Sequence, residues 1–102
     1  MIYLTQLIYV HPGREQAFQE FEDTVLPLLG KYRGELLLRL RPGLEAKIAG
    51  SSEAPYEVHV LGFASEQDLA AYSSDAERQR ALPLKERSVR SSFLIKGSAD
   101  AP

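Results

Sequence analysis

Apolar and polar residues alternate in four segments of the chain, and this alternation predicts four strands. Successive side chains of a strand point to opposite faces of a sheet, so a period of two is typical of strands. Turn sequences follow the first two segments: His11-Pro12-Gly13 and Pro42-Gly43. The predicted strands run from Ile2 to Val10, Glu35 to Arg41, Tyr56 to Phe63 and Val89 to Lys96.

Between the first two strands the apolar spacing changes to three and four residues, which predicts an amphipathic helix from Gly13 to about Tyr32. Pro27 lies inside this segment and should kink the helix or reset its last turn, because proline has no backbone N–H. Gly30 or Gly34 is the expected C-terminal cap. The apolar stripe consists of Phe18, Phe21, Val25, Leu28, Leu29 and Tyr32.

A second helical region is predicted between the third and fourth strands. The sequence Ser65-Glu66-Gln67-Asp68 is typical of a helix start in which the serine hydroxyl caps the first turn. This helix should carry Leu69 and Tyr72 inward. A short further helical piece is expected from Asp75 to about Pro83.

The order strand, helix, strand, strand, helix, strand predicts an α+β protein with the ferredoxin-like βαββαβ fold. With right-handed crossovers, the four strands form one antiparallel sheet in the order 4-1-3-2, with both helices on one face. We expect a single domain over residues 1–97 and a flexible tail over residues 98–102, where the side chains are small and polar.

The alternation also predicts which side chains share a face of the sheet. The face toward the helices should be nearly all apolar, and it collects Ile2, Leu4, Gln6, Ile8, Val10, Leu36, Leu38, Leu40, Tyr56, Val58, Val60, Val89, Ser91, Phe93 and Ile95. The other face, which we call the mixed face, collects Tyr3, Thr5, Leu7, Tyr9, Glu35, Leu37, Arg39, Arg41, Glu57, His59, Leu61, Phe63, Arg90, Ser92, Leu94 and Lys96. Exposed apolar patches usually meet a partner or a ligand, so we expect a homodimer that buries the mixed face.

Composition narrows the classes of function. The chain has 102 residues and a formal net charge of −2, which argues against a nucleic-acid partner because such a surface needs clustered Lys and Arg. The absence of cysteine excludes thiolate catalysis and disulfides. No segment approaches the roughly 20 apolar residues of a membrane span, and the N-terminus has no signal-peptide pattern. We therefore expect a cytoplasmic protein without a membrane partner.

No cofactor is predicted. The two histidines, His11 and His59, are 48 residues apart and have no paired carboxylates around them, which is a poor pattern for a metal site. The sequence also contains no glycine-rich phosphate loop and no serine nucleophile elbow.

His59 is the candidate catalytic residue, because an imidazole in mid-strand can act as a general base near neutral pH. The alternative is a structural histidine paired with a neighbour. If the hairpin pairs Leu38 with Val60, Arg39 lies opposite His59. Arg39 could then hold a substrate carboxylate, or it could form a cross-strand ion pair. The same register predicts that Arg41 lies opposite Glu57.

Hydroxyl groups on the mixed face are candidates for substrate binding: Tyr3, Thr5, Tyr9 and Ser92. Tyrosine is also common at interfaces, where its ring is buried. Gln6 is the one polar residue in the helix-facing row of the first strand, and a helix backbone is its expected partner. Four acidic residues of the first helix are interpreted as a solvated face: Glu15, Glu20, Glu22 and Asp23.

Three segments resemble a widespread bacterial family of small domains of unknown function. They are Met1 to Gly13, Glu57 to Glu66, and Phe93 to Gly97. That family belongs to the dimeric α/β-barrel superfamily, together with muconolactone isomerase and the antibiotic-biosynthesis monooxygenases. The resemblance implies that two sheets pack face to face, with a pocket inside the barrel or between sheet and helices.

The sequence leaves two functions open. One is a cofactor-independent enzyme of the isomerase, lyase or monooxygenase type, acting on a small hydrophobic or carboxylate-bearing molecule. The other is a non-catalytic ligand-binding or dimeric scaffold protein, which the lack of a tight catalytic constellation favours. An RNA-binding module shares the strand order, but two features argue against it: the negative net charge, and a third strand that lacks the aromatic-basic signature needed for stacking on RNA.

Overall fold

The predicted order of elements is present in the computed structural model of the chain, which describes residues 1–99. The last three residues of the predicted flexible tail, 100–102, lie outside the described residues. The elements are β1 (Ile2–Val10), α1 (Glu15–Val25), the 3-10 helix η1 (Leu26–Tyr32), β2 (Gly34–Leu40), β3 (Glu57–Phe63), α2 (Glu66–Ser73), α3 (Ala76–Ser88) and β4 (Val89–Ser98).

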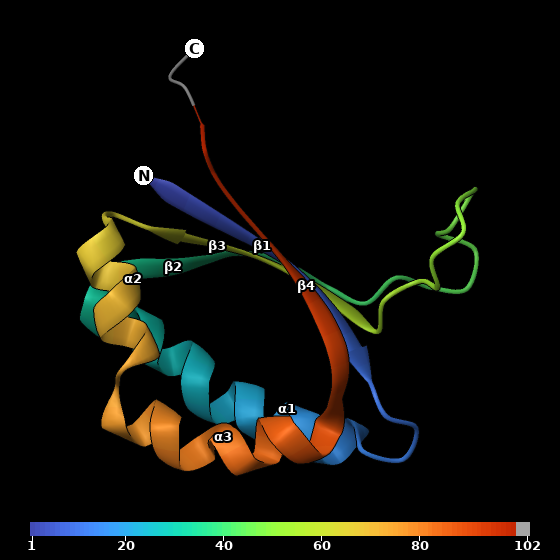
Figure 1. Cartoon of the computed structure of the whole chain (residues 1–102), viewed down its shortest axis with the longest axis horizontal. Helices are drawn as coiled ribbons and strands as arrows, with labels where there is room; N and C mark the ends of the chain where they lie inside the picture. The colour runs from blue at the N-terminus through green and yellow to red at the C-terminus, as the bar shows by residue number, and fades with distance from the viewer. Residues whose placement is uncertain (100–102) are drawn as a thin grey trace.

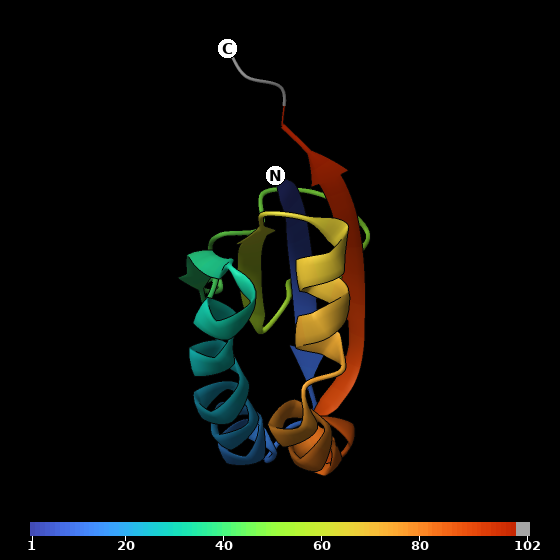
Figure 2. The same cartoon turned by 90° about the vertical axis from the view of Figure 1, so that its left-hand side faces the viewer.

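The four strands form one antiparallel sheet in the order β2-β3-β1-β4, which confirms the predicted topology. All helices lie on one side of this sheet (Figure 1). In the view turned by 90°, α1 and η1 follow one another along one side of the molecule, and α2 and α3 along the other (Figure 2). Within residues 1–99 the opposite side of the sheet carries no helix, so the sheet has a helix-covered face and an outer face.

Pro27 resets the first helix as expected, but the predicted glycine cap is wrong. The α-helix ends at Val25, and the chain continues as the 3-10 helix η1 with Pro27 in its first turn. Gly30 lies inside η1 and Gly34 begins β2. The left-handed conformation falls on Arg33 instead, with φ of 53°, and its guanidinium donates to Asp68 at 2.8 and 3.1 Å.

The second helical region starts as predicted and runs further than predicted. The Ser65 hydroxyl accepts the backbone N–H of Asp68 at 3.2 Å, and the Asp75 carboxylate accepts that of Arg78 at 2.9 Å. Pro83 lies inside α3, which continues to Ser88, so the predicted end near Pro83 is wrong. Residues on both sides of Pro83 pack against α1, and this packing holds the helix together past the missing hydrogen bond: Ala81, Leu82 and Leu84.

The predicted hairpin register is confirmed. Leu38 lies opposite Val60 and Arg39 opposite His59. The register shifts between Leu36 and Leu38, so Leu37 is an extra residue in β2. Its Cδ1 lies 3.4 Å from the position that a Cβ on Gly62 would occupy, on the outer face.

The face assignment is right for β1 and wrong for most of the other three strands. Gln6 of β1 faces the helices and lies opposite His59, so His59 faces the helices too. The same rule, that directly opposite residues share a face, turns the row Glu57, His59, Leu61 and Phe63 inward, and Ser92, Leu94 and Lys96 with it. It turns Leu38, Leu40, Val58, Val60, Phe93 and Ile95 to the outer face.

Alternation could not decide the faces because both sides of this sheet carry apolar rows. A strand with apolar residues at every other position normally points them at the core. Here β3 places a charged and a titratable side chain, Glu57 and His59, on the buried face, where other residues of the chain satisfy them. The valines between them point outward instead.

The core lies between the covered face and the helices. One group of buried residues joins β1 and β3 to η1 and α2, and it consists of Leu4, Leu28, Leu29, Leu61, Phe63 and Tyr72. A second group joins α1 to α3 through Phe21, Val25 and Ala81.

Gly34→Ala should destabilise the fold by about 1–3 kcal/mol through overpacking. A Cβ at this position would lie 2.6 Å from Cε1 of Phe63, whose ring is fully buried and cannot move aside freely. Urea unfolding measures the change. Gly30→Ala is the matched control, since nothing lies within 4 Å of its Cβ position. Equal stability of the two variants would contradict the packing described here.

Candidate functional site

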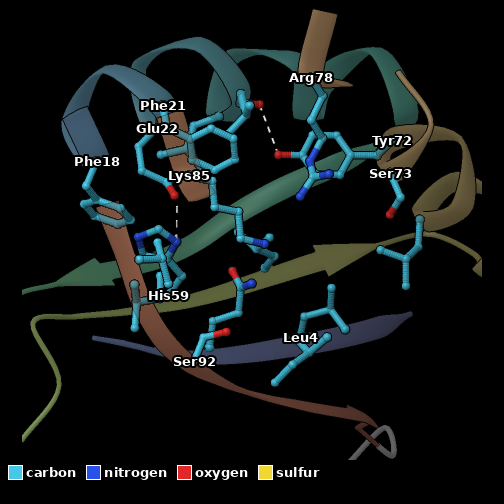
Figure 3. A pocket seen from close by; sticks show the side chains of 18 of the residues that line it. Leu4, Phe18, Phe21, Glu22, His59, Tyr72, Ser73, Arg78, Lys85 and Ser92 are labelled. Carbon is cyan, nitrogen blue, oxygen red and sulfur yellow. Dashed lines mark hydrogen bonds and ion pairs between the residues drawn. The ribbon is translucent and has the colours of Figure 1, made fainter. Parts of the chain in front are cut away.

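A cavity of about 270 Å³ lies between the covered face of the sheet and the helices. Its apolar wall includes Leu4, Ile8, Phe18, Phe21, Val25, Leu26, Leu61, Leu69, Val89 and Leu94. Its polar lining comes from Gln6, Glu22, His59, Tyr72, Ser73, Arg78, Lys85, Ser92 and Lys96. Figure 3 shows the labelled polar side chains on both sides of the cavity: His59 and Ser92 from the sheet, and Glu22, Tyr72, Ser73, Arg78 and Lys85 from α1, α2 and α3.

Behind one wall of the cavity, the Glu57 carboxylate is fully buried and accepts hydrogen bonds from three residues. His59 Nε2 donates to Oε1 at 2.6 Å, Arg39 Nε donates to the same oxygen, and Arg41 Nε donates to Oε2 at 2.9 Å. Gln19 of α1 joins the two arginines to the helix layer, since its Oε1 accepts from Arg41 Nη2 at 2.8 Å. Burial alone would raise the pKa of Glu57, but these three donors outweigh it and lower the pKa to about 2.

The contact with Glu57 fixes how the His59 ring is oriented. Because an ionised carboxylate only accepts, the Nε2 atom carries the proton in this contact. In the neutral ring the lone pair then lies on Nδ1, which is 4.0 Å from Oε2 of Glu22. Phe18 stacks on the ring with its centroid 6.4 Å away. His59 is therefore a base held by a carboxylate, with its free nitrogen toward Glu22.

Glu22 is buried in the cavity, so its interpretation as part of a solvated helix face is wrong. It occupies a position in α1 between Phe18 and Val25, on the face that packs against the sheet. Burial raises the pKa of this carboxyl more than the neighbouring His59 and Arg39 lower it. Glu22 thus keeps its proton to a higher pH than an ordinary glutamate.

Two cations of α3 line the same cavity, and neither Arg78 nor Lys85 has a carboxylate within 4.0 Å among residues 1–99. The Arg78 guanidinium lies over the Tyr72 ring, 5.1 Å from its centroid. Burial, followed by the charge of Arg78, lowers the pKa of Lys85 more than Glu22 raises it. Figure 3 shows both side chains pointing into the cavity.

The structure brings together only part of the predicted site. His59 and Ser92 line the cavity, and Arg39 contacts Glu57 behind it. Arg41, which was predicted to lie opposite Glu57, forms an ion pair with it. Arg39 is likewise paired within the chain: its Nε donates to Glu57, and its Nη2 donates to Gln19 Oε1 at 3.3 Å.

The other predicted binding residues lie on the outer face, away from His59. Thr5 is opposite Val60, and Tyr3 is opposite Gly62. The Tyr9 hydroxyl donates to the backbone carbonyl of Glu53 at 2.8 Å, across the outer face. Alternation along β1 separates these three residues from Gln6, which shares the inner row with His59. Gln6 lines the cavity itself, whereas a helix backbone was its predicted partner.

Sequence reasoning missed Glu22, Arg78 and Lys85. Each of them lies three or four residues from an apolar residue of the same helix face. Glu22 follows Phe18 by four, Arg78 precedes Ala81 by three, and Lys85 follows Ala81 by four. A charged residue that replaces an apolar one in such a stripe is the signal that points to a buried polar site.

Within residues 1–99, no cluster of three or more His, Asp or Glu side chains is arranged to hold a metal ion. In that same part of the chain, no helix combines the length and the apolar character that crossing a membrane requires.

Neither a scan of known family models nor a search of curated proteins gave a match. Solved structures do match over nearly the whole chain. The methylated RPA0582 protein of Rhodopseudomonas palustris has 17% identity and a TM-score of 0.86, over 99% of this chain and 82% of that one. A dimeric ferredoxin-like protein of unknown function from Jannaschia sp. CCS1 has 17% identity and a TM-score of 0.72, over 96% and 98%.

An uncharacterised NIPSNAP domain protein from Burkholderia xenovorans has 13% identity and a TM-score of 0.69, over 99% of this chain and 96% of that one. Likeness at these identities shows the fold alone. The chain is a ferredoxin-like α+β protein, and its structural neighbours include bacterial proteins of unknown function. The relation to muconolactone isomerase and the monooxygenases stays a prediction.

Glu57→Gln should destabilise the protein by about 3 kcal/mol at pH 7, because it leaves His59, Arg39 and Arg41 without their buried counter-charge. The folded-state pKa of Glu57, about 2, lies below the ordinary 4.5. Its ionisation therefore stabilises the fold fully above pH 4.5, and this stability is lost as the pH falls toward 2. The difference between wild type and variant should shrink over this range in urea unfolding.

The control is Glu53→Gln, which removes an exposed partner of Arg90 and should change stability by less than about 0.5 kcal/mol. A difference for Glu57→Gln that stays constant from pH 7 to pH 2 would show that the Glu57 charge is not what stabilises the cluster.

Proposed function

We propose that this protein binds a small molecule with an apolar body in the cavity between sheet and helices, and that it moves a proton on that molecule without a cofactor. The observation that carries the proposal is the facing pair in the cavity: a buried Glu22 with a raised pKa, and the Nδ1 of His59, 4.0 Å away. Small hydrophobic or carboxylate-bearing molecules with an enolisable C–H bond are the substrates that this pair suits.

The chemistry needs one base and one acid. His59 Nδ1 takes a proton from carbon next to a carbonyl group, and the protonated Glu22 carboxyl gives its proton to the carbonyl oxygen, so the product is the enol. The imidazolium that forms is stabilised by the Glu57 carboxylate at Nε2. Return of a proton to a different carbon completes an isomerisation. The resemblance to a family of the dimeric α/β-barrel superfamily, to which muconolactone isomerase also belongs, supports an enzyme of this type.

A non-catalytic ligand-binding protein is the second candidate. The same cavity supports it, because an apolar wall with a few polar groups is typical of small-molecule sites whether or not they are catalytic. The two candidates differ in one measurable property, which is proton exchange on a bound ligand.

We also propose that the protein is a homodimer that buries the outer face of the sheet. Two apolar rows cross all four strands there: Leu38, Val60, Thr5, Ile95 and Leu40, Val58, Leu7, Phe93. Of these, Leu38, Leu40, Phe93 and Ile95 are exposed in the single chain. Two structural neighbours are described as dimeric, which supports this arrangement. This face keeps Tyr3, Thr5, Leu7 and Tyr9 of the predicted mixed face. It carries Leu38, Leu40, Val58, Val60, Phe93 and Ile95 in place of most of the residues predicted from β2, β3 and β4, His59 included.

Proton transfer is tested by incubating the protein with phenylpyruvate in D₂O and following the loss of its C3–H signal by NMR. The wild type should accelerate exchange over buffer, and Glu22→Gln should reduce the protein-dependent rate by about 100-fold or more. Glu20→Gln, an exposed residue of the same helix, is the control and should leave the rate unchanged. Phenylpyruvate that binds to the wild type without faster exchange would favour the non-catalytic candidate.

The dimer is tested by light scattering at micromolar concentration, where the wild type should give twice the mass of one chain. Ile95→Glu places a charge in the outer apolar row and should give monomers. Ala71→Glu, an exposed position on α2, should stay dimeric. A wild-type mass of one chain would refute the proposal.

A further inference from the structure

We propose that Arg78 and Lys85 of α3 form a carboxylate-binding subsite, so that the ligand of the cavity is an organic acid with an apolar body. This inference rests on the proposed function for the position of the ligand. It assigns the acid group to α3, whereas the sequence pattern assigned it to Arg39, whose guanidinium is already paired with Glu57.

Arg78 supplies the first observation. Its Nε lies out of contact with solvent and has no hydrogen-bond acceptor among residues 1–99. A buried donor without a partner is costly, and native proteins rarely keep one unless a ligand or water satisfies it. The guanidinium has a planar set of donors that matches a carboxylate in two parallel hydrogen bonds. Its Cζ already lies over the Tyr72 ring, 5.1 Å from the centroid.

Lys85 supplies the second. It lies seven residues after Arg78, about two turns along the same helix, and also lines the cavity. The positive charges of Arg78 and Lys85 repel each other within the cavity, and burial removes part of the hydration shell of each side chain. A bound anion relieves both effects at once. The remaining lysine of the lining, Lys96, already has a partner, since its Nζ donates to Glu66 at 2.7 Å.

The lining favours a carboxylate over a phosphate. Helix N-termini offer backbone N–H groups to phosphates, but the N-terminus of α3 is capped by Asp75, whose charge would repel such a ligand. Near α3 the wall combines apolar side chains, Phe21 and Val25, with the polar Glu22, Tyr72 and Ser73. The α3 donors that face the cavity are those of Arg78 and Lys85, which suffice for the two oxygens of a carboxylate, whereas the three oxygens of a phosphate group need more donors.

The test is calorimetric binding of phenylacetate and of its neutral analogue phenylacetamide. The wild type should bind the acid more tightly than the amide. Arg78→Met and Lys85→Met keep an apolar side chain of similar length, and each should weaken phenylacetate binding by about 10-fold or more, since a hydrogen bond to a charged group contributes roughly 1.5–3 kcal/mol. Neither should change the affinity for phenylacetamide.

Arg80→Met is the matched control, an exposed arginine of the same helix that should leave both affinities unchanged. Thermal unfolding of each variant checks the fold, and Lys85→Met should be at least as stable as the wild type because it removes a desolvated charge. Equal affinity for acid and amide, or unchanged acid binding by both α3 variants, would overturn the subsite. So would tighter binding of phenyl phosphate than of phenylacetate.

Failure of the subsite can be distinguished from failure of the proposed function. If acid and amide bind equally and Glu22→Gln still abolishes proton exchange on phenylpyruvate, the cavity is the site and only the α3 assignment is wrong. If no ligand binds to the wild type and no exchange is seen, the proposed function fails together with the subsite.

Discussion

The buried carboxylate of Glu57 is the constraint on which the arrangement of this protein depends. A charge with no contact to solvent is tolerated only when donors surround it, and here they come from β3 and β2, through His59, Arg39 and Arg41. Gln19 then joins the two arginines to α1. One ion cluster therefore fixes the β2-β3 register, the orientation of the His59 ring and the position of α1 on the sheet.

This cluster is also the reason that the hydrophobic pattern assigns most side chains of β2, β3 and β4 to the wrong face of the sheet. The fold itself follows from the sequence, because element type depends on local periods and caps: Ser65 caps α2, Pro27 ends α1, and the strand order is the one that short right-handed connections allow. The register of the hairpin was also predictable from charge complementarity between Arg39, Arg41 and the Glu57–His59 strand.

The faces, and with them the site, were not predictable in this way. Alternation gives two sets of residues for each strand and leaves open which set is buried. Leu38, Val58 and Val60 are apolar and would be expected in the core, but they lie on the outer face. Glu57 and His59 are polar and would be expected on the surface, but they are fully buried. Opposite residues share a face, so the pairing of Gln6 with His59 decides the matter, and that pairing is a property of the β1-β3 register, which the sequence does not display. Glu22 was misjudged for the same reason, since its burial depends on what α1 packs against.

The two carboxyl groups beside His59 differ in the direction of their pKa shifts, and that difference favours an acid–base site over a purely structural ion cluster. Three donors lower the pKa of Glu57 to about 2, so it remains a charge that orients Nε2 and stabilises an imidazolium. Burial raises the pKa of Glu22, so it can remain a proton donor on the other side of the ring. A structural cluster needs only the first of these groups. Neighbouring groups whose surroundings push their pKa values apart are typical of sites that move protons, because one group must hold its proton while the other does not. The cavity beside this pair is also lined by two α3 cations, Arg78 and Lys85, that no carboxylate of residues 1–99 pairs with. It supplies the space and the charge for a molecule on which the proton moves.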